Sequence, residues 1–279
     1  MVGPTIGSID IIADESIRYI VEQEENIFER TYKHAKVNIT YLPEHDMFRK
    51  FMEDSTRVII TTRPLSAEEI SFFEQRQSHP QQTAFATGAL AFIVSSNSRD
   101  TVYDFEEIMG MFQQQNGKTF VIENAKSGIS TEMMKLIGTD SLPPHFYALK
   151  SKNDVVDYVS GHENAIGILD WSEISDSDNN EAQKLLASIQ LIGIKRPVDS
   201  IQAGYLRPYQ YNLQDRLYPF TRDLYFINRT GRSDVATGFA SFIAGEIGQK
   251  IILKSGLLPK FQSERILEIR NSPDIKVVN

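Results

Sequence analysis

The stretch SIDIIADES, residues 8–16, contains the local pattern that recurs along the chain: an apolar strand, a polar turn and the start of a helix. Residues 8–13 read as a short strand, and apolar residues recur at helical spacing from Ile17, with Asp14 or Ser16 as the cap. The device recurs at Thr61-Thr62-Arg63 and at Ser127-Gly128-Ile129-Ser130-Thr131. Hydroxyl groups and free backbone N–H groups at a helix start suit a bound anion. Because open α/β sheets bind ligands at the carboxyl ends of their strands, the three turns predict a binding site for a small oxyanion between two lobes.

Strands and helices alternate along the first part of the chain. The expected strands are residues 8–13, 36–42 and 57–61, and apolar residues line one face of a short helix at residues 47–52. Ser66 and Glu69 form a capping box for the next helix. This alternation predicts a parallel sheet with helices on its faces.

A long extended segment, residues 83–94, leads into a second strand–helix series. The expected strands are 118–123, 146–150 and 165–169, the helices are 127–137 and 154–160, and 188–195 is another extended run. The polar residues 172–181 read as a surface loop. Residues 205–228 read as extended, and residues 233–254 as helical, ending near Gly256. Two series joined by two long crossings predict two lobes with a hinge: residues 1–88 with 221–279, and residues 89–220.

Composition excludes several functional classes. The 279 residues are 41% hydrophobic and carry a net charge of −8, which argues against a nucleic-acid surface. The chain has no cysteine, so it has neither disulfides nor thiolate metal sites. Its five histidines are scattered without ligand spacing, and we expect no metal and no cofactor. No nucleophile elbow or Walker loop is present, which predicts that the protein is not an enzyme.

The sequence does not show in which cellular compartment the protein works. No stretch approaches the ~20 apolar residues of a membrane span, and residues 1–4 lack the basic and apolar regions of a signal peptide. We expect either a cytoplasmic protein or the trimmed form of an exported one.

Several segments, in order along residues 8–259, resemble the phosphate-binding proteins of bacterial ABC transporters, which have the type II periplasmic-binding fold. Residues 61–69 (TTRPLSAEE) look like that family's S-R-P-L-x-x-E-E segment, and residues 88–94 (GALAFIV), followed by Asn97, look like G-I-A-V-I-V-N. Residues 165–167 match A-I-G, and residues 218–225 (YPFTRDLY) are similar to Y-P-L-T-R-P-L-Y. Residues 238–256 resemble the family's C-terminal helices.

The resemblance implies a two-lobed α/β protein of the type II periplasmic-binding-protein fold, with two hinge crossings. It implies an extracytoplasmic monomer, lipid-anchored before trimming, that captures phosphate or a similar small oxyanion for an ABC transporter permease. The sequence departs from the family pattern at the site. Glu123 stands where the family carries an anion-binding Arg, and Ile129 where it carries the Thr of G-S-G-T. An alternative is therefore a binding or sensor module of the same fold with a changed ligand.

The candidate ligand-binding residues come from the three turns: Asp14, Glu15, Ser16, Thr61, Thr62, Arg63, Ser127, Gly128 and Ser130. Ser127 and Ser130 are either anion donors or plain helix caps. Arg63 offers a guanidinium suited to phosphate, or pairs with Glu68 or Glu69. Strand alternation points only one of Thr61 and Thr62 into the cleft, and Thr61 is the preferred donor.

Asp14 and Glu15 oppose a simple anion site, because like charges repel. Hydrogen phosphate, however, has a proton to donate and sulfate has none, so one carboxylate acceptor would select phosphate over sulfate. The alternative is that both carboxylates only favour the helix N-terminus electrostatically.

Overall fold

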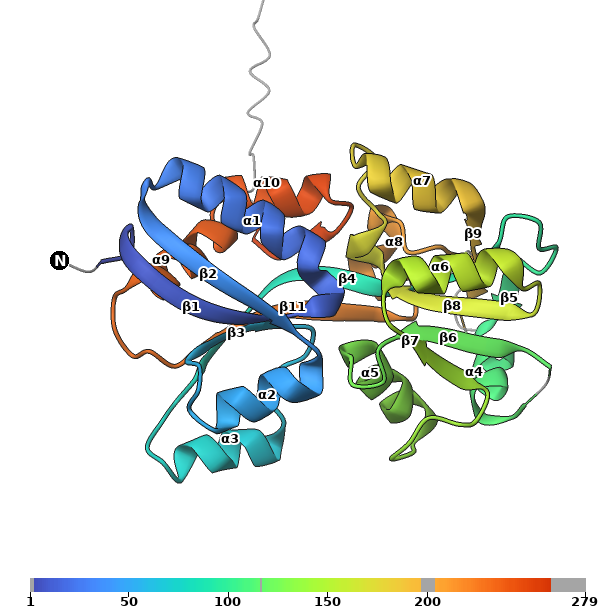
Figure 1. Cartoon of the computed structure of the whole chain (residues 1–279), viewed down its shortest axis with the longest axis horizontal. Coiled ribbons are helices and arrows are strands. Elements are labelled where there is room, and N and C mark those ends of the chain that lie inside the picture. The colour runs from blue at the N-terminus through green and yellow to red at the C-terminus, as the bar shows by residue number, and fades with distance from the viewer. Residues whose placement is uncertain (1–2, 116, 197–203, 262–279) are drawn as a thin grey trace, which may run out of the picture.

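The computed structural model describes residues 3–115, 117–196 and 204–261, and these form two lobes joined by two long strands (Figure 1). One ten-stranded sheet runs through both lobes, in the order β2-β1-β3-β11-β4-β8-β6-β7, with β12 and β9 also paired to β4. The crossing strands are β4 (Gln81–Ser95) and β11 (Thr221–Asn228). The expected α/β fold with two lobes and two hinge crossings is confirmed.

The first lobe contains both the first and the last of the described residues. Its elements are β1 (Ile6–Asp14), the 3₁₀ turn η1 (Glu15–Ile17), α1 (Arg18–Thr31), β2 (His34–Leu42), α2 (Glu44–Met52), β3 (Val58–Thr61), α3 (Ala67–Glu74), α9 (Val235–Ala244), α10 (Glu246–Lys254) and β12 (Leu258–Pro259). β1 pairs in parallel with β2 and β3, so the turns that follow β1 and β3 lie at the same edge of the sheet.

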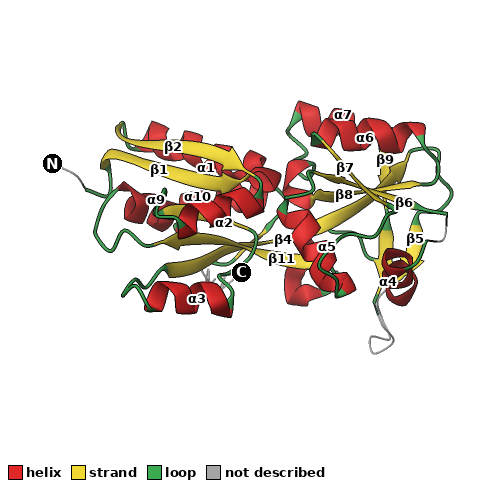
Figure 2. Ribbon diagram, turned by 60° about the horizontal axis from the view of Figure 1, so that its bottom comes forward, coloured by secondary structure: helices red, strands yellow, loops and turns green. Residues whose placement is uncertain are grey.

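Helices cover both faces of this sheet, with α1, α9 and α10 on one side and α2 and α3 on the other (Figures 1 and 2). The α2–α3 side has its own apolar cluster, in which Phe51 and Phe73 meet edge to face with ring centroids 5.1 Å apart. On the opposite side Phe28 packs against Phe239 and Phe242. Burial on both faces explains why β3 reads as a continuous apolar run.

The second lobe is built from the middle of the chain. Its elements are β5 (Val102–Asp104), α4 (Phe105–Gln113), β6 (Thr119–Glu123), α5 (Gly128–Ile137), β7 (Phe146–Leu149), α6 (Lys152–Gly161), β8 (Ala165–Asp170), the 3₁₀ turn η2 (Trp171–Glu173), α7 (Asn180–Ser188), β9 (Ile189–Leu191), β10 (Gly193–Lys195), α8 (Gln210–Leu213) and the 3₁₀ turn η3 (Gln214–Arg216). β6 pairs in parallel with β7 and β8, which again places the turns after β6 and β8 at one edge.

β4 changes partners as it passes from one lobe to the other. Its first half pairs with β11 as far as Ala89, and Leu90 to Ile93 pair with β8. Tyr218 fixes this crossing point, because its fully buried hydroxyl donates to the carbonyl oxygen of Leu90 over 2.9 Å. The division of the chain at 88/89 and 220/221 stays a prediction.

The structure corrects three local expectations. Residues 172–181 are not a surface loop: Ser172, Glu173 and Asp176 are buried, and α7 begins at Asn180. The run 188–195 splits into β9 and β10, which belong to different sheets. Residues 205–228 include the helical turns α8 and η3 before β11 begins. In each case the observed structure depends on contacts with distant segments, which local composition does not encode.

None of the helices in the described ranges combines the length and the apolar composition that a membrane crossing requires.

Candidate functional site

The three predicted turns meet where the two lobes face each other, and Gly128 marks the meeting point. A Cβ atom built on Gly128 would lie 2.8 Å from Asp14 Oδ2, 2.8 Å from Thr62 Oγ1 and 3.0 Å from Glu44 Oε2. Asp14, Thr62 and Glu44 belong to the first lobe, whereas Gly128 begins α5 in the second. The turns after β1, β3 and β6 therefore converge on one point, as the sequence predicts.

Asp14 and Ser16 form the first-lobe side, directly after β1. Asp14 caps η1, because its Oδ1 accepts a hydrogen bond from the backbone N–H of Ser16 over 2.9 Å. The Asp14 carboxyl is fully buried, which together with the nearby Glu44 carboxylate raises its pKa to about 7, against the opposing effect of Arg222. This carboxyl is therefore ready to gain or lose a proton near neutral pH.

Thr62, not Thr61, points toward the meeting point, which corrects the preference for Thr61. The Thr62 hydroxyl donates to Asp14 Oδ2 over 3.5 Å and accepts from Arg222 Nη1 over 3.3 Å. The Thr61 hydroxyl is buried and has no hydrogen-bond partner among the described residues. Strand alternation correctly predicts opposite directions for the two threonines, but not which one faces the other lobe.

Arg222, on β11, is the buried cation of the site. Its guanidinium donates to Asp170 Oδ2 through Nε over 2.9 Å and through Nη2 over 2.6 Å. Nη2 also donates to the Ser16 hydroxyl over 3.2 Å. Only 6% of the Arg222 side chain and none of the Asp170 side chain is exposed. Arg222 thus connects hydroxyl groups of the first lobe to a carboxylate at the end of β8 in the second.

Arg63 is engaged by two carboxylates of its own lobe. Its Nε donates to Glu44 Oε1 over 3.1 Å, and its two terminal nitrogens donate to Glu69 over 2.8 and 2.9 Å. The guanidinium also lies 3.6 Å above the Phe48 ring. Of the two possibilities for Arg63, the structure contains the pairing with Glu69. A contact between Arg63 and a ligand stays a prediction.

Ser127 and Ser130 hold the start of α5. The Ser127 hydroxyl accepts from the Ser130 N–H over 3.3 Å, and the Ser130 hydroxyl donates to the carbonyl oxygen of Asn124 over 3.0 Å. Ser127 therefore caps α5, and Ser130 connects the helix to the turn that precedes it. A contact of either serine with a ligand stays a prediction. By helix geometry the N–H groups of Gly128 and Ile129 have no acceptor within α5. They are the donors that this turn offers to an anion.

A second set of acidic groups lies beside the meeting point. Glu15 accepts from the Asn124 side chain of the other lobe over 2.8 Å. Glu173 accepts from the Tyr19 N–H and from Lys152 Nζ, both over 2.8 Å. Glu123 is half-buried, and its burial and the nearby carboxylates of Glu173 and Glu15 raise its pKa to about 7. Glu123 is therefore part of this interface between the lobes.

The described residues contain no group of three or more His, Asp or Glu side chains placed to hold a metal ion.

Sequence reasoning missed Arg222, Asp170 and Glu44 as members of the site. Arg222 lies within the segment 218–225 that carries the family resemblance, and Asp170 follows an apolar strand like the other turns. Glu44 gave no comparable signal, because an acidic residue in the first turn of a helix is ordinary.

The comparisons with solved structures support the fold. A protein described as a phosphate ABC transporter substrate-binding protein from Clostridium perfringens, with bound phosphate, is 16% identical, with a TM-score of 0.73 over 91% of this chain and 99% of that one. An ABC-type phosphate transport receptor from Vibrio cholerae is 15% identical, with a TM-score of 0.67 over 91% and 100% of the two chains. A regulatory domain, that of CcmR from Synechocystis in complex with 2-PG, is 11% identical, with a TM-score of 0.56 over 85% and 95%.

No curated protein sequence is similar enough to this chain to count as a match. A family model described as the PBP superfamily domain matches residues 2–246, which is most of the chain. The chain therefore belongs to the family that this model describes, the PBP superfamily domain.

Proposed function

We propose that this chain is an extracytoplasmic solute-binding protein that captures a small oxyanion, inorganic phosphate, and delivers it to the permease of an ABC transporter. The observation that carries the proposal is the convergence of three strand-end turns on the first residue of α5, Gly128. A small anion held there by backbone N–H groups would be enclosed by both lobes. Closure about the two crossing strands is the motion that such a fold provides.

The residues around Gly128 favour an oxyanion that carries a proton. The N–H groups that begin α5 supply donors, and Arg222, whose guanidinium donates to the Thr62 and Ser16 hydroxyls, supplies a buried positive charge. Asp14 supplies an acceptor, which a fully ionised sulfate has no proton to satisfy. Hydrogen phosphate matches both kinds of group, and this supports phosphate over sulfate as the ligand.

In this proposal the protein performs no chemistry and works as a monomer. The lobes are residues 1–88 with 221–279 and residues 89–220, and the contacts to the anion come from the residues predicted from the turns, with the exception of Thr61. A lipid anchor would hold the protein near its permease.

Calorimetric titration with phosphate and with sulfate tests the proposal. Phosphate should bind, and it should raise the melting temperature because a ligand bound only by the folded state stabilises it, by about 2.7 kcal/mol at a hundred times Kd. Sulfate should bind more weakly. Absence of any thermal shift at millimolar phosphate would remove phosphate as the ligand and leave the fold unaffected.

A second candidate function is a sensor or binding module that takes a different ligand. It is favoured by Glu123, a half-buried carboxylate beside Glu15 and Glu173 at the position where the resembled family has an anion-binding Arg. Phosphate titrations of the wild type and of Glu123→Arg separate the two candidates. Tighter binding by the variant favours a phosphate site weakened by Glu123, and binding by neither protein favours the changed ligand, a cationic or neutral small molecule.

A further inference from the structure

We infer that the outer end of the first lobe holds a second binding site, separate from the site between the lobes, for a small phosphorylated polyol such as a sugar phosphate. The inference goes beyond the proposed function and stands without it. The site is a cavity of about 620 Å³ where β11 leads into α9, at the left of Figure 1. Cavities that bind small molecules are typically about 300–1,000 Å³, so this one has room for such a ligand.

Two turns form the walls of the cavity. Residues 77–79, between α3 and β4, form one wall, and residues 229–233, between β11 and α9, form the other. Between them β4 begins and β11 ends, where Gln81 pairs with Asn228. Arg222, the buried cation of the site between the lobes, lies six positions before Asn228 on the same strand. At about 3.3 Å per strand residue, the two sites are therefore about 20 Å apart.

Arg229 gives the cavity a guanidinium that is held through one nitrogen. Its side chain is 11% exposed, and its Nη2 donates to the carbonyl oxygens of Phe51 and Thr56 over 3.1 and 2.9 Å. Nη2 also donates to Asp54 Oδ1 over 2.5 Å. Within the described residues, every hydrogen bond of this side chain runs through Nη2. The protein therefore fixes the guanidinium in position and leaves the donors on Nε and Nη1 unused.

Two buried polar atoms at this turn have no hydrogen-bond partner among the described residues. They are Arg229 Nε and the hydroxyl oxygen of Thr230, the next residue. Because buried polar atoms are nearly always paired, two unpaired atoms on adjacent residues call for an explanation. An oxygen of a ligand bound in the cavity is the acceptor that the Arg229 guanidinium lacks.

The lining of the cavity offers positive charge without negative charge. Arg229 and Arg232 both line it, and none of the lining residues that the structure describes is Asp or Glu. The Arg232 side chain is 73% exposed, and only its Nε is engaged, over 3.4 Å to Asp234 Oδ2. Its two terminal nitrogens stay available for a ligand. In a chain with a net charge of −8, this cavity is a local site for an anion.

The two carboxylates that contact these arginines have other partners as well. Asp234 Oδ1 caps α9, because it accepts from the N–H groups of Ala236 and Thr237 over 3.1 and 3.3 Å. Asp54 Oδ1 also lies 3.9 Å from Arg57 Nε. With Arg57 included, three guanidinium groups are balanced by two carboxylates. One positive charge of this cluster is therefore left for a ligand to neutralise.

The chemistry of the lining favours a phosphate monoester that carries several hydroxyl groups. A guanidinium binds phosphate through two parallel hydrogen bonds, and two guanidinium groups match a dianion better than the single charge of a carboxylate. The other lining side chains include one histidine, three amides and three hydroxyls. Amides and hydroxyls both donate and accept hydrogen bonds, as the hydroxyls of a sugar do. The described lining contains no Phe, Tyr or Trp on which a nucleobase could stack, which favours a sugar phosphate over a nucleotide.

Glucose 6-phosphate is the probe that tests the inference, with glucose and inorganic phosphate as its two halves. Calorimetry gives the affinities, and hydrogen–deuterium exchange followed by mass spectrometry gives the location. The wild type should bind glucose 6-phosphate at least about tenfold more tightly than either half, because each half leaves part of the lining unpaired. The bound probe should slow amide exchange in residues 228–237. Exchange in residues 14–16 and 127–130 reports separately on the site between the lobes.

Arg232→Gln is the first variant, because this side chain is exposed and its removal leaves the packing of the lobe intact. It should weaken binding of glucose 6-phosphate by about ten- to a hundredfold, which is the loss expected for a charge-assisted contact. Arg229→Lys is the second variant. Lysine keeps the charge but lacks the planar fork of the guanidinium, so binding should weaken here too. Circular dichroism shows whether Arg229→Lys folds, and Arg232→Gln decides alone if it does not.

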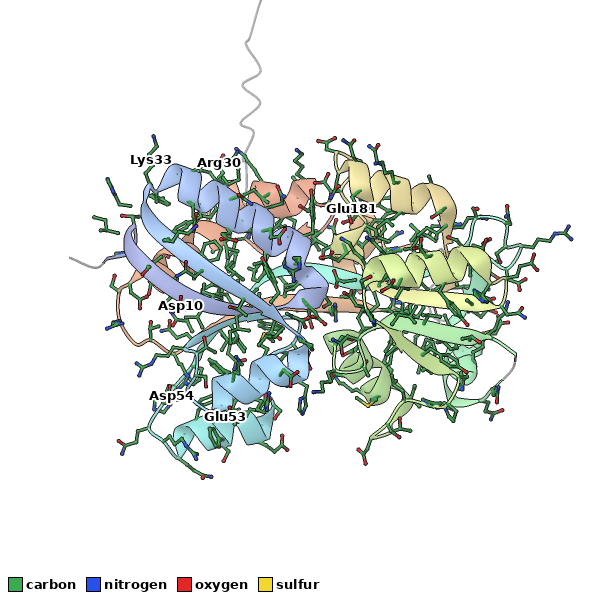
Figure 3. All side chains as sticks on the ribbon, viewed as in Figure 1. Asp10, Arg30, Lys33, Glu53, Asp54 and Glu181 are labelled. Atoms are coloured by element: carbon green, nitrogen blue, oxygen red, sulfur yellow. The ribbon has the colours of Figure 1, made fainter. Side chains whose placement is uncertain are left out.

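Arg30→Gln is the matched control. Arg30 is exposed in the last turn of α1, and Figure 3 shows it at the opposite edge of the first lobe from Asp54, which contacts Arg229. This variant should bind glucose 6-phosphate as the wild type does.

The outcomes separate this inference from the proposed function. The inference is overturned if the wild type does not bind glucose 6-phosphate, if Arg232→Gln binds it as tightly as Arg30→Gln, or if amide protection appears only at the turns between the lobes. Equal affinity for inorganic phosphate at residues 228–237 would overturn the assignment of a polyol, and equal affinity for glucose would overturn that of a phosphate. Protection of residues 127–130 by inorganic phosphate is the readout of the proposed function, so either idea can fail while the other holds.

Discussion

Replacing Gly128 with alanine should hinder closure of the lobes without harming either lobe. The added methyl group would lie 2.8 Å from both Asp14 Oδ2 and Thr62 Oγ1, closer than carbon and oxygen atoms can approach without a shift. Neither oxygen can retreat easily, because Asp14 caps η1 and Thr62 accepts from Arg222. The clash exists only when the lobes are together, because Gly128 belongs to the second lobe, and the oxygens around its Cβ position, from Asp14, Thr62 and Glu44, belong to the first.

The expected cost follows from the size of the clash. Inserting one methyl group into a packed contact costs about 1–3 kcal/mol, which corresponds to about a 5- to 150-fold loss of phosphate affinity if binding requires closure. The helix itself should not suffer, because alanine is a better helix former than glycine by about 1 kcal/mol. The free energy of unfolding should therefore fall much less than the free energy of binding.

Two measurements check this expectation. Small-angle X-ray scattering with saturating phosphate should give a larger radius of gyration for Gly128→Ala than for the wild type, and calorimetry should give the affinity loss. Gly110→Ala is the matched control, because Gly110 lies in α4, where a Cβ atom would meet no atom of the described residues within 4 Å. If Gly128→Ala were as compact and bound phosphate as tightly as Gly110→Ala, the assignment of this contact to closure would be wrong.

Two further predictions concern buried charges. Arg222→Met leaves the fully buried Asp170 without its cation and should lower the free energy of unfolding by about 3–5 kcal/mol. The double variant Arg222→Met/Asp170→Leu should recover most of this loss. Urea unfolding of both proteins measures the two values, and an equal loss in the double variant would contradict the prediction. Glu24 is 1% exposed, neither of its carboxyl oxygens has a hydrogen-bond partner among the described residues, and burial raises its pKa to about 9. Because an unfolded-chain glutamate ionises above about pH 4, the unfolded state releases this proton first, and the free energy of unfolding should fall by up to about 1.4 kcal/mol per pH unit between these two pKa values. Glu24→Gln should remove that slope in urea unfolding at several pH values, and an unchanged slope would mean that Glu24 is already ionised in the folded protein.

Local signals in the sequence were sufficient for most of the fold. The capping box of Ser66 and Glu69 is present in full, and Ser127 caps α5 as the hydroxyl-rich turn indicated. These features need only residues three or four positions apart, so a single sequence contains them completely. The crossing strand β4 was also predictable, because it is long, apolar and buried over most of its length.

The membership of the site depends on contacts that sequence spacing does not encode. Arg222 meets Ser16 and Asp170 across separations of 206 and 52 residues, and Glu44 reaches Gly128 only because the lobes face each other. The buried polar stretch after β8 was misread for the same reason. Glu173 is acceptable in the interior because Lys152 and the Tyr19 N–H satisfy it, and both lie far away in sequence.

The acidic character of the site is compatible with capture of an anion once the charges are assigned to their partners. A protein with a net charge of −8 gives an approaching anion no general attraction, so electrostatic steering would not speed its entry. Arg222 and Arg63 are both balanced by carboxylates, so a second negative charge on the ligand would gain little from them. What remains at Gly128 is a set of hydrogen-bond donors beside two carboxylate acceptors. In the proposed function, a ligand that carries a proton suits such a set better than one that carries none, because it donates a hydrogen bond where the other would repel a carboxylate. In the proposed function, then, the carboxylates that replace a simple cationic cradle determine specificity, and they do so at the cost of binding strength when the ligand has lost its protons.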